Sequence, residues 1–240
     1  MGYIIVIEGT DGCGKQTQTK LLYERLKDEG YNVMSQSFPN YDSPSSSPIK
    51  MYLAGEFGSA NDTDAYQASS LYAVDRLCTY KKDLKEFYDN GGIIVFDRYV
   101  ESNMLFQASK IKDDAERDKF LEWLDDFEFG LLKLPKADKV LFLDVPIDVS
   151  LQLIKERGEY KSAKAKDIHE ESREVLENAY NSGKYVGKKF GWDIIPCTTD
   201  DNKLKSIEEI SELIWDSVQQ DLSVSSFLRR KYGDKDFSIN

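Results

Sequence analysis

Gly9-Thr10-Asp11-Gly12-Cys13-Gly14-Lys15 decides the fold, because it follows the pattern glycine, any four residues, glycine and lysine. Glycines allow the backbone N–H groups of such a loop to curl around a phosphate. The helix that follows adds the partial positive charge of its N-terminus. The lysine can bridge the β- and γ-oxygens of a nucleotide. The stretch therefore predicts a loop that holds a polyphosphate; a glycine turn between a strand and a helix is the structural alternative.

The sequence on both sides of the loop provides the context that such a loop needs. Tyr3–Ile7 is an apolar run typical of a buried strand, and Leu21, Leu22 and Leu26 recur at helical spacing. Strands and helices continue to alternate, which favours an α/β fold of three layers, a parallel sheet flanked by helices. Further strands are expected at Tyr31–Ser37, Ile93–Phe96, Val140–Leu143 and Asp193–Pro196. Further helices are expected from the cap Asp62-Thr63 to about Tyr88, and at Glu101–Lys110, Asp114–Gly130, Ile147–Arg157 and Ile207–Gln220.

Composition limits the classes of protein that fit. The chain has 240 residues, 40% of them hydrophobic and 31% charged, which suits a compact globular domain. Its net charge of −11 argues against nucleic acid as the main partner, and no apolar run is long enough to span a membrane. The three cysteines form no CxxC pair, so we expect neither a disulfide framework nor a zinc site. A reduced, cytoplasmic protein follows.

Two segments interrupt the alternation of strands and helices. Gly158–Lys166 is polar and rich in lysine and lies between two helices, which predicts a short mobile lid at about residues 158–168. Residues 221–240 resemble a polar tail that contains the basic cluster Arg229-Arg230-Lys231. Residues 1–220 are then expected to form a single domain.

The residue after the lysine of the loop bears on metal binding. Ser or Thr is usual there, because its hydroxyl ligates Mg²⁺, but this chain has Gln16, followed by Thr17. An amide oxygen can also ligate Mg²⁺, directly or through water. We therefore expect Mg²⁺ as the cofactor, with Gln16 as a candidate ligand.

Asp97 and Arg98 follow the strand expected at Ile93–Phe96, at the edge where open α/β sheets place ligands. Asp97 can hold Mg²⁺ through water, and Arg98 can bind an acceptor phosphate together with the group in transfer. A helix-capping aspartate beside a surface arginine is the structural alternative.

Tyr72 and Arg76 lie one helical turn apart and therefore project from the same face. An aromatic ring beside a guanidinium can stack on a base and hydrogen-bond its edge. From these residues alone, a core tyrosine beside a surface arginine is an equally good interpretation.

Taken together, these segments resemble the thymidylate kinase family of P-loop nucleoside monophosphate kinases. The resemblance covers about residues 3–220. Its motifs are Asp11 with Gln16-Thr17-Gln18, Phe38-Pro39 after the second strand, Tyr72 with Arg76, and Asp97-Arg98-Tyr99 followed by Ser102 and Phe106-Gln107.

The resemblance implies transfer of the γ-phosphate of ATP to dTMP, giving dTDP and ADP for dTTP synthesis, by a homodimer. It assigns ATP binding to Gly9, Thr10, Asp11, Gly12, Cys13, Gly14, Lys15, Gln16 and Thr17. In the acceptor site it implies that Tyr72 stacks on thymine and that Arg76 reaches a base carbonyl. Asp11 would read the 3′-hydroxyl, and Phe106 would pack near the 2′ position as a steric gate. The full acceptor set is Asp11, Phe38, Tyr72, Arg76, Arg98, Ser102, Phe106 and Gln107, with Ser102 and Gln107 at the base edge.

The lid departs from the family pattern. Family members carry an arginine in the phosphate loop or in the lid, where it stabilises charge that develops during transfer. This loop has none, so Arg157 at the start of the lid is the first candidate, with Lys161 or Lys164 as substitutes. The catalytic residues expected are Lys15, Asp97, Arg98 and Arg157.

Three alternatives remain. Another nucleoside monophosphate is a possible acceptor. A deoxynucleoside kinase would need a carboxylate base just after the second strand, where this chain has Phe38-Pro39-Asn40. In a different class, the chain would be an ATP-binding regulatory switch; a guanine-specific switch is disfavoured because Asn202-Lys203-Leu204-Lys205 lacks the required aspartate.

Overall fold

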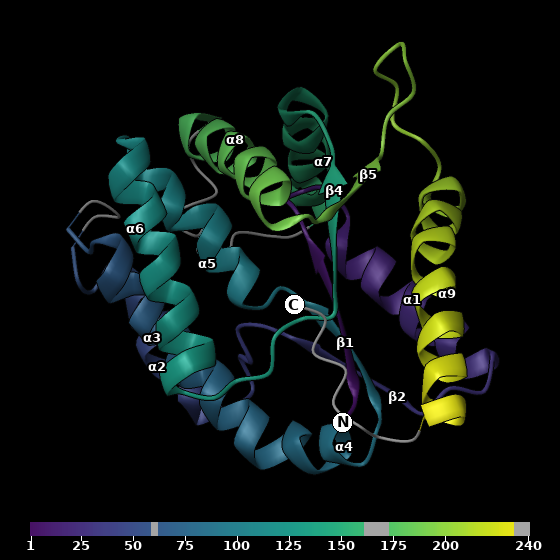
Figure 1. Ribbon diagram of the computed structural model, residues 1–240. Coiled ribbons are helices and arrows are strands. Elements are labelled where there is room, and N and C mark those ends of the chain that lie inside the picture. The colour runs from purple at the N-terminus through teal and green to yellow at the C-terminus, as the bar shows by residue number, and fades with distance from the viewer. Residues whose placement is uncertain (59–61, 161–172, 233–240) are drawn as a thin grey trace.

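The computed structural model describes residues 1–58, 62–160 and 173–232 (Figure 1). Within these residues, five strands form one fully parallel sheet in the order β2-β3-β1-β4-β5. The strands are β1 (Tyr3–Glu8), β2 (Val33–Ser37), β3 (Ile93–Asp97), β4 (Lys139–Asp144) and β5 (Asp193–Pro196). The predicted α/β fold with a parallel sheet is confirmed, and every predicted strand is present within two residues of its expected ends.

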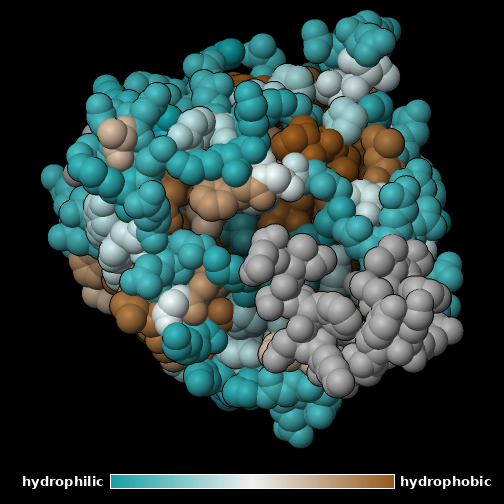
Figure 2. Space-filling model, in the orientation of Figure 1, coloured by the Kyte–Doolittle hydropathy of each residue, from teal (hydrophilic) through white to brown (hydrophobic). Residues whose placement is uncertain are grey.

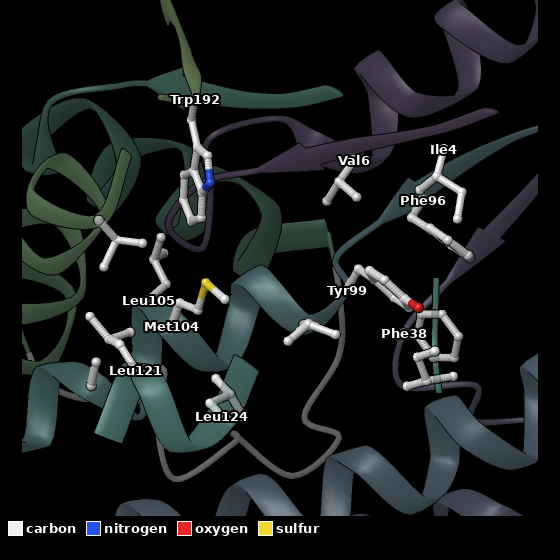
Figure 3. Packing of buried hydrophobic residues seen from close by; sticks show 14 of the residues in the cluster. Ile4, Val6, Phe38, Phe96, Tyr99, Met104, Leu105, Leu121, Leu124 and Trp192 are labelled. Carbon is white, nitrogen blue, oxygen red and sulfur yellow. The ribbon is translucent and has the colours of Figure 1, made fainter. Parts of the chain in front are cut away.

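Two hydrophobic cores lie on the two faces of the sheet, because successive side chains of a strand point to opposite faces. In β1, Ile4 and Val6 belong to one core and Ile5 and Ile7 to the other. Figure 3 shows Ile4 and Val6 on the first face with side chains from the strands and helices around them. β1 is buried along its whole length, which explains why Tyr3–Ile7 is an unbroken apolar run rather than an alternating one.

Helices cover both faces, as the three-layer prediction requires (Figure 1). α1 (Lys15–Asp28) and α9 (Ile207–Tyr232) contribute Leu22, Leu26 and Ile214 to the core shared with Ile5. α5 (Val100–Phe106), α6 (Asp114–Asp125) and α8 (Arg173–Phe190) pack on the other face. The remaining α-helices of the described chain are α2 (Ser47–Leu53), α3 (Ala65–Thr79), α4 (Lys85–Asp89) and α7 (Ile147–Tyr160).

The long helix predicted from Asp62-Thr63 starts later than expected. The cap is Asp64: its carboxylate accepts a hydrogen bond from the Gln67 N–H, and the Gln67 side chain accepts one from the Asp64 N–H. Near the far end, a π-helical turn over Tyr80–Leu84 separates α3 from α4. The reciprocal cap depends on a glutamine at the third helical position, and Gln67 has that position only when Asp64 is the cap. The predicted cap at Asp62-Thr63 is therefore wrong.

Other boundaries also differ from the sequence prediction. The helix predicted at Asp114–Gly130 ends as α6 at Asp125 and passes into a π-helical turn over Asp126–Leu131. α9 does not end near Gln220 but continues to Tyr232, so the first part of the predicted tail is helical. Leu222 is buried against the α1 side of the sheet, which gives this helix an apolar anchor beyond its expected end.

The surface is largely hydrophilic on the face seen in Figure 2, with apolar side chains in separate groups. No helix in the described part of the chain is long and apolar enough to cross a membrane. Most of the predicted lid and the last eight residues of the predicted tail lie outside the described residues.

Candidate active site

A cavity of about 520 Å³ opens at the carboxyl ends of β1, β2 and β3, the edge where the sequence places ligands. The phosphate loop, which joins β1 to α1, lies beside this cavity. Asp11 of the loop and Gln16 of α1 line the wall of the cavity. The structure brings all eight predicted acceptor residues to this one cavity: Asp11, Phe38, Tyr72, Arg76, Arg98, Ser102, Phe106 and Gln107.

The phosphate loop is held closed by its own lysine. The Lys15 ammonium donates hydrogen bonds to the carbonyls of Gly9 at 3.0 Å and Thr10 at 2.7 Å. Gly12 and Gly14 have φ angles of 83° and 91°, which side chains other than glycine rarely adopt. A Cβ on Gly12 would also lie 2.6 Å from the Ser150 carbonyl of α7. The sequence therefore needs glycine here both for the turn and for the close approach of α7.

Cys13 completes the loop as a buried residue. Burial raises the pKa of its thiol, although Lys15 and Arg98 act in the opposite direction. The thiol is therefore neutral at physiological pH, which leaves the loop free of a thiolate that would repel a phosphate.

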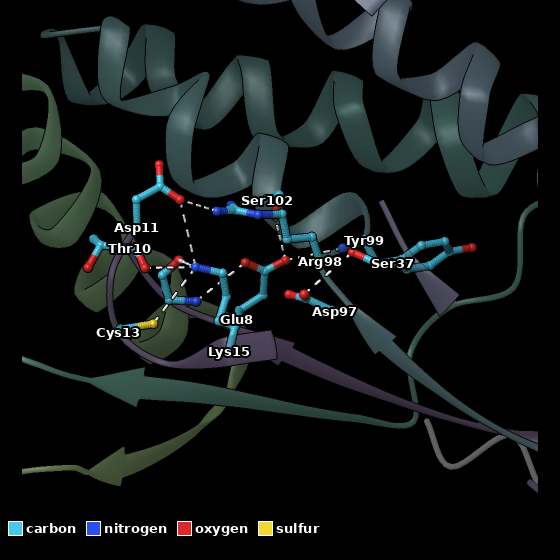
Figure 4. A network of polar contacts seen from close by, with 11 residues as sticks. Glu8, Thr10, Asp11, Cys13, Lys15, Ser37, Asp97, Arg98, Tyr99 and Ser102 are labelled. Atoms are coloured by element: carbon cyan, nitrogen blue, oxygen red, sulfur yellow. Dashed lines mark hydrogen bonds and ion pairs between the residues drawn. The ribbon is translucent and has the colours of Figure 1, made fainter. Parts of the chain in front are cut away.

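Arg98 links the acceptor side of the site to the phosphate loop (Figure 4). Its guanidinium donates to an Asp11 carboxylate oxygen and lies 5.1 Å above the centre of the Phe106 ring. Burial would lower the pKa of Arg98, but the carboxylates of Asp11, Glu8 and Asp97 raise it overall, so the arginine stays charged. Its φ of 67° is costly for a residue with a side chain, of the order of 1–3 kcal/mol.

Glu8 lies beneath this arginine and is fully buried. One of its carboxylate oxygens accepts hydrogen bonds from the Tyr99 N–H at 3.1 Å and the Ser102 hydroxyl at 2.7 Å. The other lies 3.4 Å from the N–H of Gly9, the first residue of the phosphate loop. Burial raises the pKa of Glu8, opposed by Arg98, Ser102 and Lys15.

Asp97 and Gln16 provide oxygen atoms suited to Mg²⁺. Asp97 accepts a hydrogen bond from the Ser37 hydroxyl at 3.4 Å through one oxygen. Its other oxygen is buried and has no hydrogen-bond partner among the residues that the structure describes. Gln16 is exposed, and both side chains line the cavity. A buried carboxylate oxygen without a donor fits a hydrated magnesium ion, whose ligands are oxygens and water.

Tyr72 and Arg76 of α3 line the cavity together. The Tyr72 ring packs edge-on against Tyr52, with centres 6.4 Å apart. Arg76 is buried: its Nε donates to Glu128 at 2.7 Å, a second nitrogen donates to the other Glu128 oxygen, and the third donates to the Tyr99 carbonyl. Burial would lower the pKa of Arg76, but Glu128 raises it overall. The alternative of a surface arginine is therefore wrong.

The remaining acceptor residues line the same cavity. Gln107 is buried, and its carbonyl oxygen has no hydrogen-bond partner within the described chain, which leaves an acceptor for a ligand N–H. Phe38 packs against the Phe96 and Tyr99 rings, so it forms a rigid wall. The Ser102 hydroxyl binds Glu8, so its hydrogen is already used on the protein.

Some candidates do not reach the cavity or lie beyond the described side chains. Lys50 of α2 does not line the cavity; it is exposed and donates to the Tyr41 carbonyl at 2.6 Å. Arg157 is part of α7, but its side chain is not described. Lys161 and Lys164 lie outside the described residues.

Sequence reasoning missed two carboxylates of the site. Glu8 carried a signal, since it is the one charged residue of an otherwise apolar buried strand. Glu128 carried almost none, because it lies between Phe127 and Phe129 in a π-helical turn far from Arg76 in sequence. Such turns are frequent at functional sites, but no local pattern announces them.

Comparison with protein families agrees with this geometry. A family model described as "Thymidylate kinase" matches residues 7–187, which include the phosphate loop and all residues of the cavity.

Similar proteins carry the same description. A "Thymidylate kinase" of Mycobacterium tuberculosis is 30% identical over 207 residues, covering 84% of this chain and 94% of the relative. A "Probable thymidylate kinase" of Pyrococcus horikoshii is 34% identical over 158 residues, covering 65% of this chain and 72% of the relative. Another, from Thermococcus onnurineus, is 30% identical and covers 91% of this chain and 98% of the relative.

Proposed function

The chain belongs to the thymidylate kinase family and transfers a phosphoryl group from ATP to dTMP, and we propose that the cavity beside the phosphate loop is where this reaction occurs. The observation that carries the proposal is the convergence of all eight acceptor candidates on one cavity of about 520 Å³ next to that loop. This volume lies within the range of about 300–1,000 Å³ typical of small-molecule sites.

The nucleoside of dTMP occupies the part of the cavity lined by Tyr72, Arg76 and Gln107. Tyr72 stacks on thymine, and Arg76 donates one of the two N–H groups that its protein partners leave unused to a base carbonyl. The unpartnered oxygen of Gln107 accepts the N3–H of the base. Phe106 faces the 2′ position and favours deoxyribose, and Asp11 accepts the 3′-hydroxyl.

The chemistry requires positioning and charge rather than a strong base. The attacking atom is a phosphate oxygen, which is already ionised near neutral pH because the second pKa of such a group is about 6. The backbone N–H groups of the loop and Lys15 hold the ATP phosphates. Arg98 holds the dTMP phosphate in line with the γ-phosphate and neutralises charge during transfer. Arg98 can do this from its observed place, because Asp11 holds the guanidinium at the cavity wall.

Asp97, through its unpartnered oxygen, and Gln16 are the residues that would hold Mg²⁺. The ion would neutralise the charge of the ATP phosphates. Arg157 is proposed as the arginine on the donor side, since the phosphate loop itself contains none. Residues 158–168 are proposed to close over the site and exclude water.

The test is a coupled assay of ADP release with ATP and one acceptor at a time. The acceptors are dTMP, dUMP, dGMP and thymidine, and one sample contains ATP without any acceptor. We expect rapid release of ADP only in the sample that contains ATP and dTMP. Equal turnover with thymidine would contradict the assignment of the acceptor, and slow ATP hydrolysis independent of any acceptor would favour a regulatory ATPase.

We also propose that two copies form a homodimer in the cytoplasm, as the family resemblance implies. All three cysteines, Cys13, Cys78 and Cys197, are free thiols, which supports a reducing compartment. Sedimentation velocity should give a species of twice 27.5 kDa. A sedimenting species of 27.5 kDa at micromolar concentration would contradict the dimer.

A further inference from the structure

The Glu8 side chain contacts both the phosphate loop and the turn Arg98–Tyr99 that leads into α5. Its carboxylate lies under the site, between Gly9 of the loop and Tyr99 and Ser102 at the start of α5 (Figure 4). It does not line the cavity and so does not contact a substrate directly. None of the roles assigned above uses it.

The Arg98–Tyr99 turn has to be stabilised by its surroundings, because Arg98 has a left-handed backbone conformation, with φ of 67°. Two hydrogen bonds, both accepted by β1, hold this residue and the next. The Arg98 N–H donates to the Ile7 carbonyl at 3.3 Å, and the Tyr99 N–H donates to the Glu8 carboxylate at 3.1 Å. Strained backbone at a functional site persists only where the surrounding structure holds it in place.

We propose that Glu8 is a positioning residue: it holds the Arg98–Tyr99 turn against the phosphate loop and so aligns Arg98 with the transferred phosphate. The Ser102 hydroxyl donates to the same Glu8 oxygen as the Tyr99 N–H, so Glu8 also fixes the start of α5 relative to β1. Arg98 and Lys15 face Glu8 with opposite charge, and Glu101 is a second buried carboxyl that repels it when ionised. The proposal rests on the role of Arg98 in the proposed function.

Two substitutions separate the parts of this role. Glu8→Gln keeps an oxygen for Tyr99 and Ser102 but removes the charge, while Glu8→Leu removes both at similar size. A misplacement of about 1 Å near reacting groups can cost about 100-fold in rate. We therefore expect kcat to fall about 100-fold in Glu8→Leu and by an intermediate factor in Glu8→Gln, with the KM for ATP changed less than about 3-fold.

Glu101→Gln is the matched control. Glu101 is also a buried glutamate of this region, with one oxygen that has no hydrogen-bond partner among described residues, but it does not line the active-site cavity. We expect its kcat to stay within about 2-fold of the wild type. Thermal unfolding of each variant distinguishes positioning from a structural role, because a positioning residue lowers kcat at temperatures well below the melting point.

The wild-type assay with dTMP comes first and tests the proposed function by itself. If the wild type is active and Glu8→Leu is folded and equally active, the positioning role is wrong while the function stands. An equal loss of kcat in Glu101→Gln would also overturn it.

Discussion

Replacing the buried Arg76–Glu128 pair by apolar residues should separate the stability of the protein from its recognition of dTMP. The two side chains are 2% and 0% exposed, and Glu128 takes two hydrogen bonds from the guanidinium. Glu128→Gln leaves a buried arginine without its counter-charge, which costs about 3–5 kcal/mol. At about 2–4 °C per kcal/mol for a chain of this size, the melting temperature should fall by roughly 6–20 °C.

The double variant Arg76→Met/Glu128→Leu removes both charges together. Apolar replacement of a buried pair is often neutral or stabilising, so most of the lost melting temperature should return. The affinity for dTMP should not return, because the methionine at position 76 has no N–H group that could donate to the base. Loss of a hydrogen bond from a charged group costs about 1.5–3 kcal/mol, which raises the KM for dTMP roughly 10- to 150-fold.

Differential scanning calorimetry and the coupled assay measure the two effects on the same samples. The KM for ATP is the internal control and should stay near the wild-type value. If the double variant is stable and keeps the wild-type KM for dTMP, Arg76 does not read the base. If Glu128→Gln melts within about 2 °C of the wild type, the pair does not carry the energy assigned to it.

Four further outcomes follow from the site and its surroundings. Arg98→Ala should lower kcat about 100- to 1,000-fold, and near-normal turnover would remove Arg98 from the mechanism. Asp97→Asn should raise the Mg²⁺ concentration for half-maximal activity about 10-fold or more, which a magnesium titration measures. Gly12→Ala should destabilise the fold by about 1–3 kcal/mol in urea unfolding and raise the KM for ATP, because its Cβ meets the Ser150 carbonyl at 2.6 Å. Burial raises the pKa of Glu101 to about 8, so its protonated form stabilises the fold fully below about pH 4.5 and progressively less as pH rises through 8. Urea unfolding should therefore show that Glu101→Gln gains about 2 kcal/mol relative to the wild type between pH 6 and 8, and a constant difference would contradict the raised pKa.

The fold was predictable wherever a local pattern has a strict physical cause. The phosphate loop needs glycine at positive φ, and Tyr3–Ile7 of β1 shows its burial as an unbroken apolar run. The start of α3 was harder, because Asp62, Thr63 and Asp64 can all cap a helix and only the partner Gln67 selects one of them. The extension of α9 was missed because its anchor, Leu222, lies in a mainly polar stretch.

The acceptor residues were predictable because they come in pairs and short motifs, such as Asp97-Arg98 at the end of a strand. The sequence could not show how they are held. The sequence is equally compatible with a surface position for Arg76, whereas in the structure Arg76 is buried against Glu128. That contact joins α3 to a π-helical turn distant in sequence, so spacing alone cannot reveal it.

Glu8 and Glu128 share a physical logic that explains why both are buried. Each accepts hydrogen bonds behind the cavity and constrains an arginine that lines it, Glu128 by direct contact and Glu8 through the backbone of the Arg98–Tyr99 turn. An arginine in a water-filled cleft samples many rotamers, and fixing one costs entropy when substrate binds. A buried carboxylate meets that cost during folding instead, so the guanidinium is already oriented when dTMP arrives. The same buried charge is expensive for the fold, which is why the burial of Glu8 raises its pKa. The site therefore exchanges stability for orientation at two carboxylates, which are joined through Tyr99: its N–H donates to Glu8 and its carbonyl accepts from Arg76. Because they share this partner, the effects of substitutions at Glu8 and Glu128 should be coupled rather than additive.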